Sequence, residues 1–137
     1  MPLLKWHDIY SVNNETIDTQ HKSIFNLLNK LYDSCISNTI DITFNTDADE
    51  LNKVINEHMA TEEEYLKIFS CPYLNEHIQK HREFEKIINE KCASKNYSSK
   101  NCEELLVTVA EFILNHIMVL DKKYSDWIES EYETNAA

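Results

Sequence analysis

The sequence places pairs of metal-ligating residue types four positions apart. His81 follows His77 by four residues, and Glu62 follows His58 at the same interval. On a helix, side chains four residues apart point the same way about one turn apart, so each pair could hold one metal ion. Imidazole nitrogens and carboxylate oxygens are groups that suit iron. A metal centre is therefore the chemistry that these two pairs favour.

Two more histidines, His21 and His116, lie singly among apolar residues that recur at helical spacing. A lone histidine on an apolar face is usually a hydrogen-bonded core residue. A single pair of ligand types four residues apart is also only weak evidence for a metal. In this chain, however, five of the six histidines would be buried together, which is costly unless each finds a partner. One shared metal centre explains all five.

Two carboxylates could complete the set of ligands, Glu62 and Asp121. Asp121 follows His116 by five residues, and five residues rotate a helix by about 140° beyond one turn. A local kink, or the end of the bundle, is therefore needed to turn Asp121 inward. We expect Glu63 and Glu64, next to Glu62, to turn outward as solvated charges.

The elements that must position these side chains are four amphipathic helices. Apolar residues recur at helical spacing, with Asp18 as a candidate N-cap and Pro72 suited to a first turn. Short polar loops between long helices imply an antiparallel, up-down-up-down four-helix bundle of the all-α class. After residue 121 the chain could prolong the last helix or form a short C-terminal helix, with Trp127 and Ile128 packing back. The predicted ranges are 1–17 for an extended N-terminal arm on which Trp6 packs against the body, and 18–37, 46–69, 72–94 and 101–121 for the helices.

The chain contains no glycine, so asparagine must serve wherever the backbone needs a positive φ. The candidate positions are Asn13, Asn14, Asn38, Asn45 and Asn96.

Length and composition limit the class of protein. The 137 residues are 42% hydrophobic, which predicts one domain over 1–137. A net charge of -11 disfavours nucleic acid and anionic membranes as partners. Without an apolar run long enough for a membrane span or a signal peptide, we expect a cytoplasmic protein. Its four cysteines have no C-x-x-C spacing, so we expect them to remain thiols.

The motifs "IDTQH", "HMATE", "HIQKH" and "HIMVLD" resemble those of the hemerythrins, in particular their single-domain bacterial members. The resemblance covers nearly the whole chain, and "KWHDIYSV" and Tyr124 are similar to residues that flank the family's motifs. Three positions depart from the family pattern. Asn13 replaces a glycine, Met59 an aromatic residue and Phe112 a tryptophan, and the last two could line the ligand pocket.

The resemblance implies a non-haem di-iron centre, with two iron ions joined by an oxo or hydroxo bridge. It implies that His77, His81 and His116 bind one iron, that His21 and His58 bind the other, and that Glu62 and Asp121 bridge the two. The second iron would keep one open position. An apolar pocket over this position is expected from four residues: Phe25, Phe84, Phe112 and Ile113.

The function implied by the resemblance is reversible binding of dioxygen, for its carriage, storage, scavenging or sensing, and we expect a monomer and no enzymatic turnover. The alternative is a di-iron redox enzyme that acts on peroxide or nitric oxide at the same open site. A signalling module and a metal-free structural bundle are further alternatives. Iron content and the response of the spectrum to dioxygen distinguish these four hypotheses.

Overall fold

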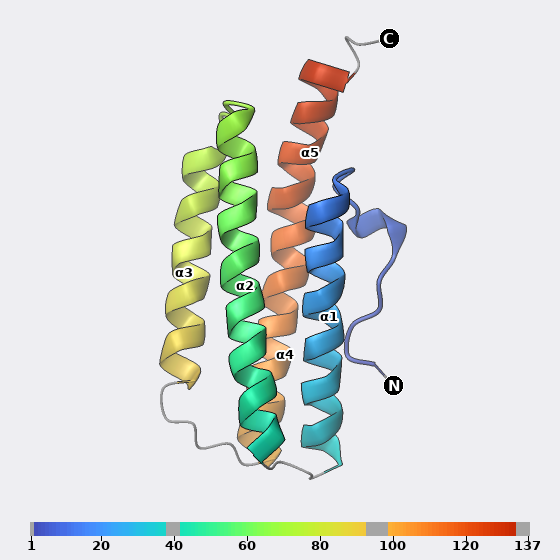
Figure 1. The fold of residues 1–137 in the computed structure, drawn as a ribbon, viewed down its shortest axis with the longest axis vertical. Helices are drawn as coiled ribbons and strands as arrows, with labels where there is room; N and C mark the ends of the chain where they lie inside the picture. Colours follow the sequence, from blue (N-terminus) through green and yellow to red (C-terminus); the bar gives the residue numbers. More distant parts are fainter. Residues whose placement is uncertain (1, 38–41, 93–98, 134–137) are drawn as a thin grey trace.

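The computed structural model describes residues 2–37, 42–92 and 99–133 and shows an all-helical bundle (Figure 1). The four long helices alternate in direction, as the sequence predicts, running down, up, down and up in Figure 1, and no β-strand occurs among the described residues. None of the described helices is long and apolar enough to cross a membrane. The elements are a short 3-10 helix at Asp8–Tyr10, α1 (Glu15–Ile36), α2 (Ile42–Ile68), α3 (Leu74–Cys92), α4 (Ser99–Asn115), the π-helical segment η2 (His116–Asp121), α5 (Lys122–Ile128) and the π-helical segment η3 (Glu129–Glu133).

The start of α1 differs from the prediction because Asn14, not Asp18, is its N-cap. The Asn14 side chain accepts a hydrogen bond of 2.9 Å from the backbone N–H of Ile17. The Asp18 carboxylate instead accepts hydrogen bonds from the Ser11 hydroxyl (2.6 Å) and the Val12 N–H (2.9 Å). Asp18 therefore ties the N-terminal arm to α1 rather than starting the helix.

The start of α2 also differs, because the helix begins at Ile42 rather than at residue 46. Phe44 in its first turn is buried in the apolar core, and this burial offsets the modest helix propensity of the polar and β-branched residues around it. At the other end of the hairpin, α3 begins at Leu74, so Pro72 precedes the helix instead of forming its first turn.

Positive φ angles occur at Asn13 (58°), as predicted, and at Ser70 (51°), which was not predicted. Asn14 has an extended conformation and Asn45 is helical, so neither uses the left-handed region. Asn38 and Asn96 lie outside the described residues.

The two ends of the chain pack on the bundle. Trp6 lies against Phe25, with ring centroids 5.7 Å apart, so the predicted packing of the arm is confirmed. At the other end, α4 passes through η2 into α5 as one continuous column (Figure 1), so the chain prolongs the last helix. Trp127 and Ile128 pack back on the bundle as expected.

Cys35 near the end of α1 and Cys102 near the start of α4 form a disulfide, with Cα atoms 6.1 Å apart. Our expectation of thiols is therefore wrong for this pair, because the antiparallel arrangement brings together two residues that are 67 positions apart in sequence. Cys71 is a buried free cysteine.

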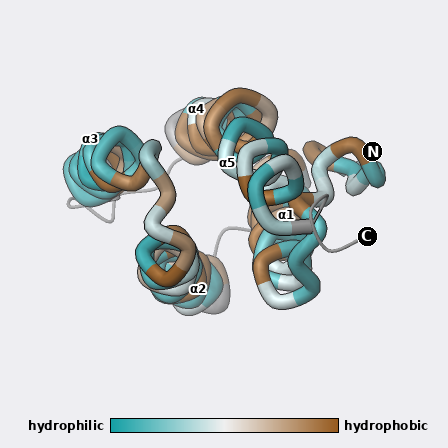
Figure 2. Tube along the Cα trace, turned by 90° about the horizontal axis from the view of Figure 1, so that it is seen from above, coloured by the Kyte–Doolittle hydropathy of each residue, from teal (hydrophilic) through white to brown (hydrophobic). Residues whose placement is uncertain are grey.

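Two apolar clusters fill the bundle, and histidines lie between them on α1, α2 and α3. Figure 2 looks along the bundle and shows α1 to α4 arranged around a common interior. On α1, Ile17 belongs to the smaller cluster and Ile24 to the larger one, and His21 lies between them. On α2, His58 and Glu62 lie between Ile55 of the larger cluster and Leu66 of the smaller one. The apolar clusters therefore enclose a buried polar layer.

Candidate metal centre

All seven predicted ligand side chains meet in this polar layer. They come from four segments: one from α1, two from α2, two from α3 and two from η2. All seven are buried, with exposed fractions between 0% and 9%. They form two groups whose donor atoms lie within 4.8 Å of one another: a three-histidine group of Glu62, His77, His81 and His116, and a two-histidine group of His21, His58, Glu62 and Asp121.

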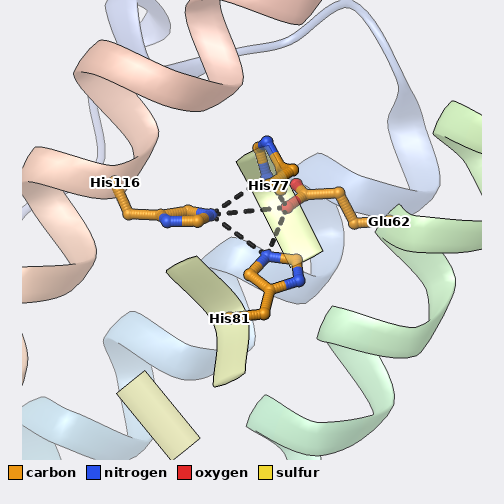
Figure 3. Close-up of side chains that lie close together, drawn as sticks. All are labelled: Glu62, His77, His81 and His116. Atoms are coloured by element: carbon orange, nitrogen blue, oxygen red, sulfur yellow. Dashed lines mark hydrogen bonds and ion pairs between the residues drawn. The ribbon is translucent and has the colours of Figure 1, made fainter. Parts of the chain in front are cut away.

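The three-histidine group converges on one carboxylate oxygen, as Figure 3 shows. Glu62 Oε1 lies 2.5 Å from His77 Nε2, 3.0 Å from His81 Nε2 and 3.5 Å from His116 Nε2. His116 Nε2 is also 3.1 Å from the Nε2 atoms of both other histidines. Three rings and one carboxylate therefore direct their donor atoms at a common point.

The two carboxylates each direct one oxygen to each group. Asp121 Oδ1 lies 3.0 Å from His77 Nε2 and 3.2 Å from His116 Nε2, whereas Oδ2 lies 3.3 Å from His21 Nε2. Glu62 Oε1 faces the three-histidine group, and its Oε2 lies 3.6 Å from His58 Nε2. Each carboxylate could therefore offer one oxygen to each of the two groups.

The π-helical segment explains how Asp121 reaches the interior. In an α-helix, a step of five residues would turn Asp121 away from His116. In η2 the backbone follows the wider i→i+5 pattern, which sets residues five apart on one face. Asp121 is 0% exposed as a result. The local distortion that the sequence requires is thus a π-helix, a feature often found at functional sites.

The seven side chains do not satisfy one another's hydrogen bonds, and their spacing suits a metal ion between them. Neither oxygen of the buried Asp121 has a hydrogen-bond partner among the described residues, despite the imidazoles nearby. The Nε2 atoms of His21 and His58 face each other at 3.0 Å, where two lone pairs would repel unless a proton or a cation lies between them. Donors at right angles, each about 2.1 Å from an ion, are about 3.0 Å apart. The spacing therefore matches that of cis ligands.

The electrostatics of the cluster show the need for positive charge. Burial lowers the pKa of His58 to about 4, since the Glu62 charge does not outweigh the loss of water. Burial also acts to lower the pKa of His116 and His77, but the nearby carboxylates of Asp121 and Glu62 outweigh it and raise these pKa values to about 10 and about 9. In the absence of metal, bound protons therefore neutralise the carboxylates.

The pKa values of the two buried carboxylates are lowered, in contrast to those of His77 and His116. Burial would raise the pKa of Glu62 and of Asp121, yet the surrounding histidines hold both pKa values well below their ordinary range. Both groups are therefore anionic at neutral pH and available to a cation.

A small apolar cavity of about 30 Å³ adjoins the cluster. A water molecule needs about 10–15 Å³ measured in this way, so the space suits a very small molecule. Phe25, which we expected in its wall, does not line it, because the Phe25 ring packs against Trp6 and Tyr10. The lining consists of His21, Ile24, Ile55, His58, Met59, His81, Phe84, Phe112, Ile113, His116 and Ile117.

The sequence analysis did not predict the contacts of three residues around the candidate ligands: Tyr124, Glu63 and Gln20. The Tyr124 hydroxyl donates to Glu62 Oε2 (2.9 Å), and burial together with the nearby carboxylates raises the pKa of Tyr124 well above its usual value. Glu63 does not turn outward but accepts a hydrogen bond from His81, whereas Glu64 is exposed as expected. Gln20 bonds the outer nitrogen of His58. Adjacency to a ligand in sequence is the only signal that could have indicated Gln20 and Glu63.

Comparison with known proteins gives a consistent result. The family model of the hemerythrin HHE cation binding domain matches residues 12–128. The chain is 30% identical over 129 residues to a bacteriohemerythrin of Campylobacter jejuni, covering 91% of this chain and 95% of the relative. It is 29% identical over 121 residues to a myohemerythrin of Theromyzon tessulatum, with 88% and 89% covered. A bacteriohemerythrin of Stenotrophomonas maltophilia is 27% identical over 130 residues, with 95% and 84% covered.

Proposed function

Because the chain belongs to the hemerythrin family, we propose that its buried cluster holds two iron ions and binds dioxygen reversibly. One ion would be held by His77, His81 and His116, and the other by His21 and His58. Glu62 and Asp121 would bridge the two ions. Bound iron supplies the electrons that dioxygen takes up on binding and gives back on release.

The observation that carries this proposal is the unequal division of donors around two shared carboxylates. The three-histidine group offers three imidazole nitrogens, and the two-histidine group offers two, while both carboxylates direct one oxygen to each side. The ion in the two-histidine group therefore has one protein ligand fewer. An open position on a redox metal is where a small molecule binds.

The cavity supports binding of a gas next to the cluster. Histidines of both groups line it, His21 and His58 from one and His81 and His116 from the other, and the remaining wall is apolar. Apart from the histidines, the wall offers no charged side chain that could orient a polar organic substrate. A dry, narrow pocket also keeps water and protons away from bound dioxygen, which favours its release unchanged.

The test is iron per chain together with visible spectra of the reduced protein before and after exposure to air. We expect two irons per chain and a coloured adduct that bleaches again under argon through several cycles. The same protein loaded with zinc is the control and should show no colour change. One-way oxidation with consumption of peroxide or nitric oxide would instead identify a di-iron redox enzyme. Protein made with iron available but isolated without it would contradict the proposal.

A further inference from the structure

The outer nitrogens of two candidate ligands meet acceptors that differ in charge. His81 Nδ1 lies 2.8 Å from Glu63 Oε2, which is a carboxylate oxygen. His58 Nδ1 lies 2.9 Å from Gln20 Oε1, which is a neutral amide oxygen. One acceptor serves the three-histidine group and the other serves the two-histidine group, so the two sides of the site are electrically unequal.

These contacts orient both imidazoles. A carboxylate only accepts hydrogen bonds, so His81 donates from Nδ1 to Glu63, and its Nε2 atom is the one that faces Glu62 and His116. The Thr61 hydroxyl donates to the Glu57 carbonyl and accepts from Gln20 Nε2 (3.1 Å). This bond sets the Gln20 amide with its oxygen towards His58.

Other contacts hold the Glu63 carboxylate in place. The side chain is 20% exposed, and the same Oε2 atom pairs with the guanidinium of Arg82. Arg82 also bonds Glu85 at 2.9 Å on the outside of the bundle. Because Arg82 is about half exposed, water screens its charge more than that of Glu63, which lies nearer the imidazole. A net negative influence on His81 remains.

Among the described residues, no acceptor bonds the Nδ1 atom of His21 or of His116, and both atoms are buried. Of the outer nitrogens that do bond a side chain, one faces Glu63 and the other faces Gln20. Carboxylate acceptors on the outer nitrogen of a metal-bound imidazole fix its orientation and raise its basicity as a ligand.

We propose that Glu63 is a positioning residue that orients His81 and stabilises the oxidised state of the ion in the three-histidine group relative to that of its neighbour. This inference rests on the proposed function, because it requires iron at both positions. A carboxylate behind the ring adds electron density to the imidazole, and the more highly charged oxidised ion gains more from that density than the reduced ion does.

The test is the Glu63→Gln variant, which keeps the size of the side chain and removes its charge. Redox titration under argon, followed by visible and Mössbauer spectra, compares the two irons without any use of dioxygen. Loss of an outer partner typically lowers metal affinity about 10–100-fold. If the oxidised ion bears about tenfold more of that loss than the reduced ion, the ratio of oxidised to reduced iron in the three-histidine group falls about tenfold at a fixed potential. This corresponds to an increase of about 59 mV for a one-electron couple.

Glu85→Gln is the matched control, because it removes a carboxylate that touches Arg82 but not His81. Its titration should match that of the unmodified protein. Gln20→Glu is the reciprocal variant, and it should lower the potential of the other ion. It also keeps the inference testable if Glu63→Gln fails to fold.

The outcomes separate this inference from the proposed function. Two irons per chain with unchanged potentials in both Glu63→Gln and Gln20→Glu would overturn the inference and leave reversible dioxygen binding intact. The expected potential shifts in the two variants, together with an unmodified protein that never releases dioxygen, would overturn the proposed function alone. A chain that takes up no iron would overturn both.

Discussion

Two layers of the same bundle are equally buried but differ in what holds them together. In the larger apolar cluster, Leu28 is 0% exposed, and in the polar layer Glu62 is also 0% exposed. Burial of a leucine side chain contributes about 1.5–3 kcal/mol to folding. Burial of an ionised carboxylate costs free energy unless cations or hydrogen-bond donors compensate it.

The comparison teaches that stability and chemistry are divided along the length of the helices. The apolar layer, with its disulfide, joins the four helices through contacts that involve no ligand. The polar layer gains its compensation from protons when metal is absent, and we infer that iron replaces those protons. The two layers should therefore respond independently to substitution.

The largest effect is expected from Glu62→Ala, which removes one of the two shared carboxylates. Iron content should fall from two per chain to near zero, because both groups lose an anionic donor. Helical content should persist, since the apolar clusters are untouched. Iron analysis and far-UV circular dichroism measure both results.

Glu64→Ala is the control for this substitution, because Glu64 lies two positions further along α2 and is exposed. It should retain two irons. Full iron content in Glu62→Ala would show that the polar layer is not the metal site. Complete unfolding of Glu62→Ala would show that the two layers are not independent.

The converse test removes the covalent link in the apolar layer. The Cys35→Ser, Cys102→Ser double variant loses a cross-link between residues 67 positions apart. In the chain-entropy model, a disulfide that closes a loop of this length raises the free energy of unfolding by up to about 4 kcal/mol. Urea titration should show that loss while iron content stays at two. Cys71→Ser, which changes a buried cysteine outside any disulfide, is the control and should lower stability much less.

The bundle and the meeting of the seven side chains could be predicted because the helical spacing of the apolar residues is visible in the sequence. Stripes through His21, His58 and His81 fix which face of each helix turns inward. The inward turn of Asp121 required a distortion that periodicity cannot specify, since a π-helix depends on the fit of neighbouring helices. The sequence analysis predicted a distortion between His116 and Asp121, but not that it would be a π-helix.

Contacts between residues far apart in the chain could not be predicted from the sequence, for a different reason. The contact of Glu63 with His81 and the bond between Cys35 and Cys102 depend on the relative rotation and height of two helices. One sequence offers no measure of either quantity. Taken alone, "TEEEY" indicates only a charged surface, and four scattered cysteines indicate only thiols. The start of α2 was missed because Phe44 overrides the local propensity through burial.

A smaller effect should appear in the pH dependence of the metal-free protein. The pKa values of His77 and His116 are about 9 and about 10 in the folded state, against about 6.5 for an unperturbed histidine. Their stabilising contribution is therefore complete below pH 6.5 and is lost as the pH rises through 9 to 10. Urea titrations from pH 6.5 to 10 should show falling stability, and a flat profile would argue against protonated histidines in the polar layer.

The smallest effect, and the sharpest comparison of the layers, comes from the same change made once in each. Ile113 lines the cavity beside the histidines, and Ile88 lines a second apolar cavity in the larger cluster. Either substitution by valine removes one methylene and should cost about 1 kcal/mol in stability. Only Ile113→Val opens space next to the position where we propose that dioxygen binds, and added water there would speed irreversible oxidation. The rate of autoxidation in air should therefore rise a few-fold in Ile113→Val and stay unchanged in Ile88→Val. Equal rates in the two variants would mean that the wall of the cavity does not protect bound dioxygen.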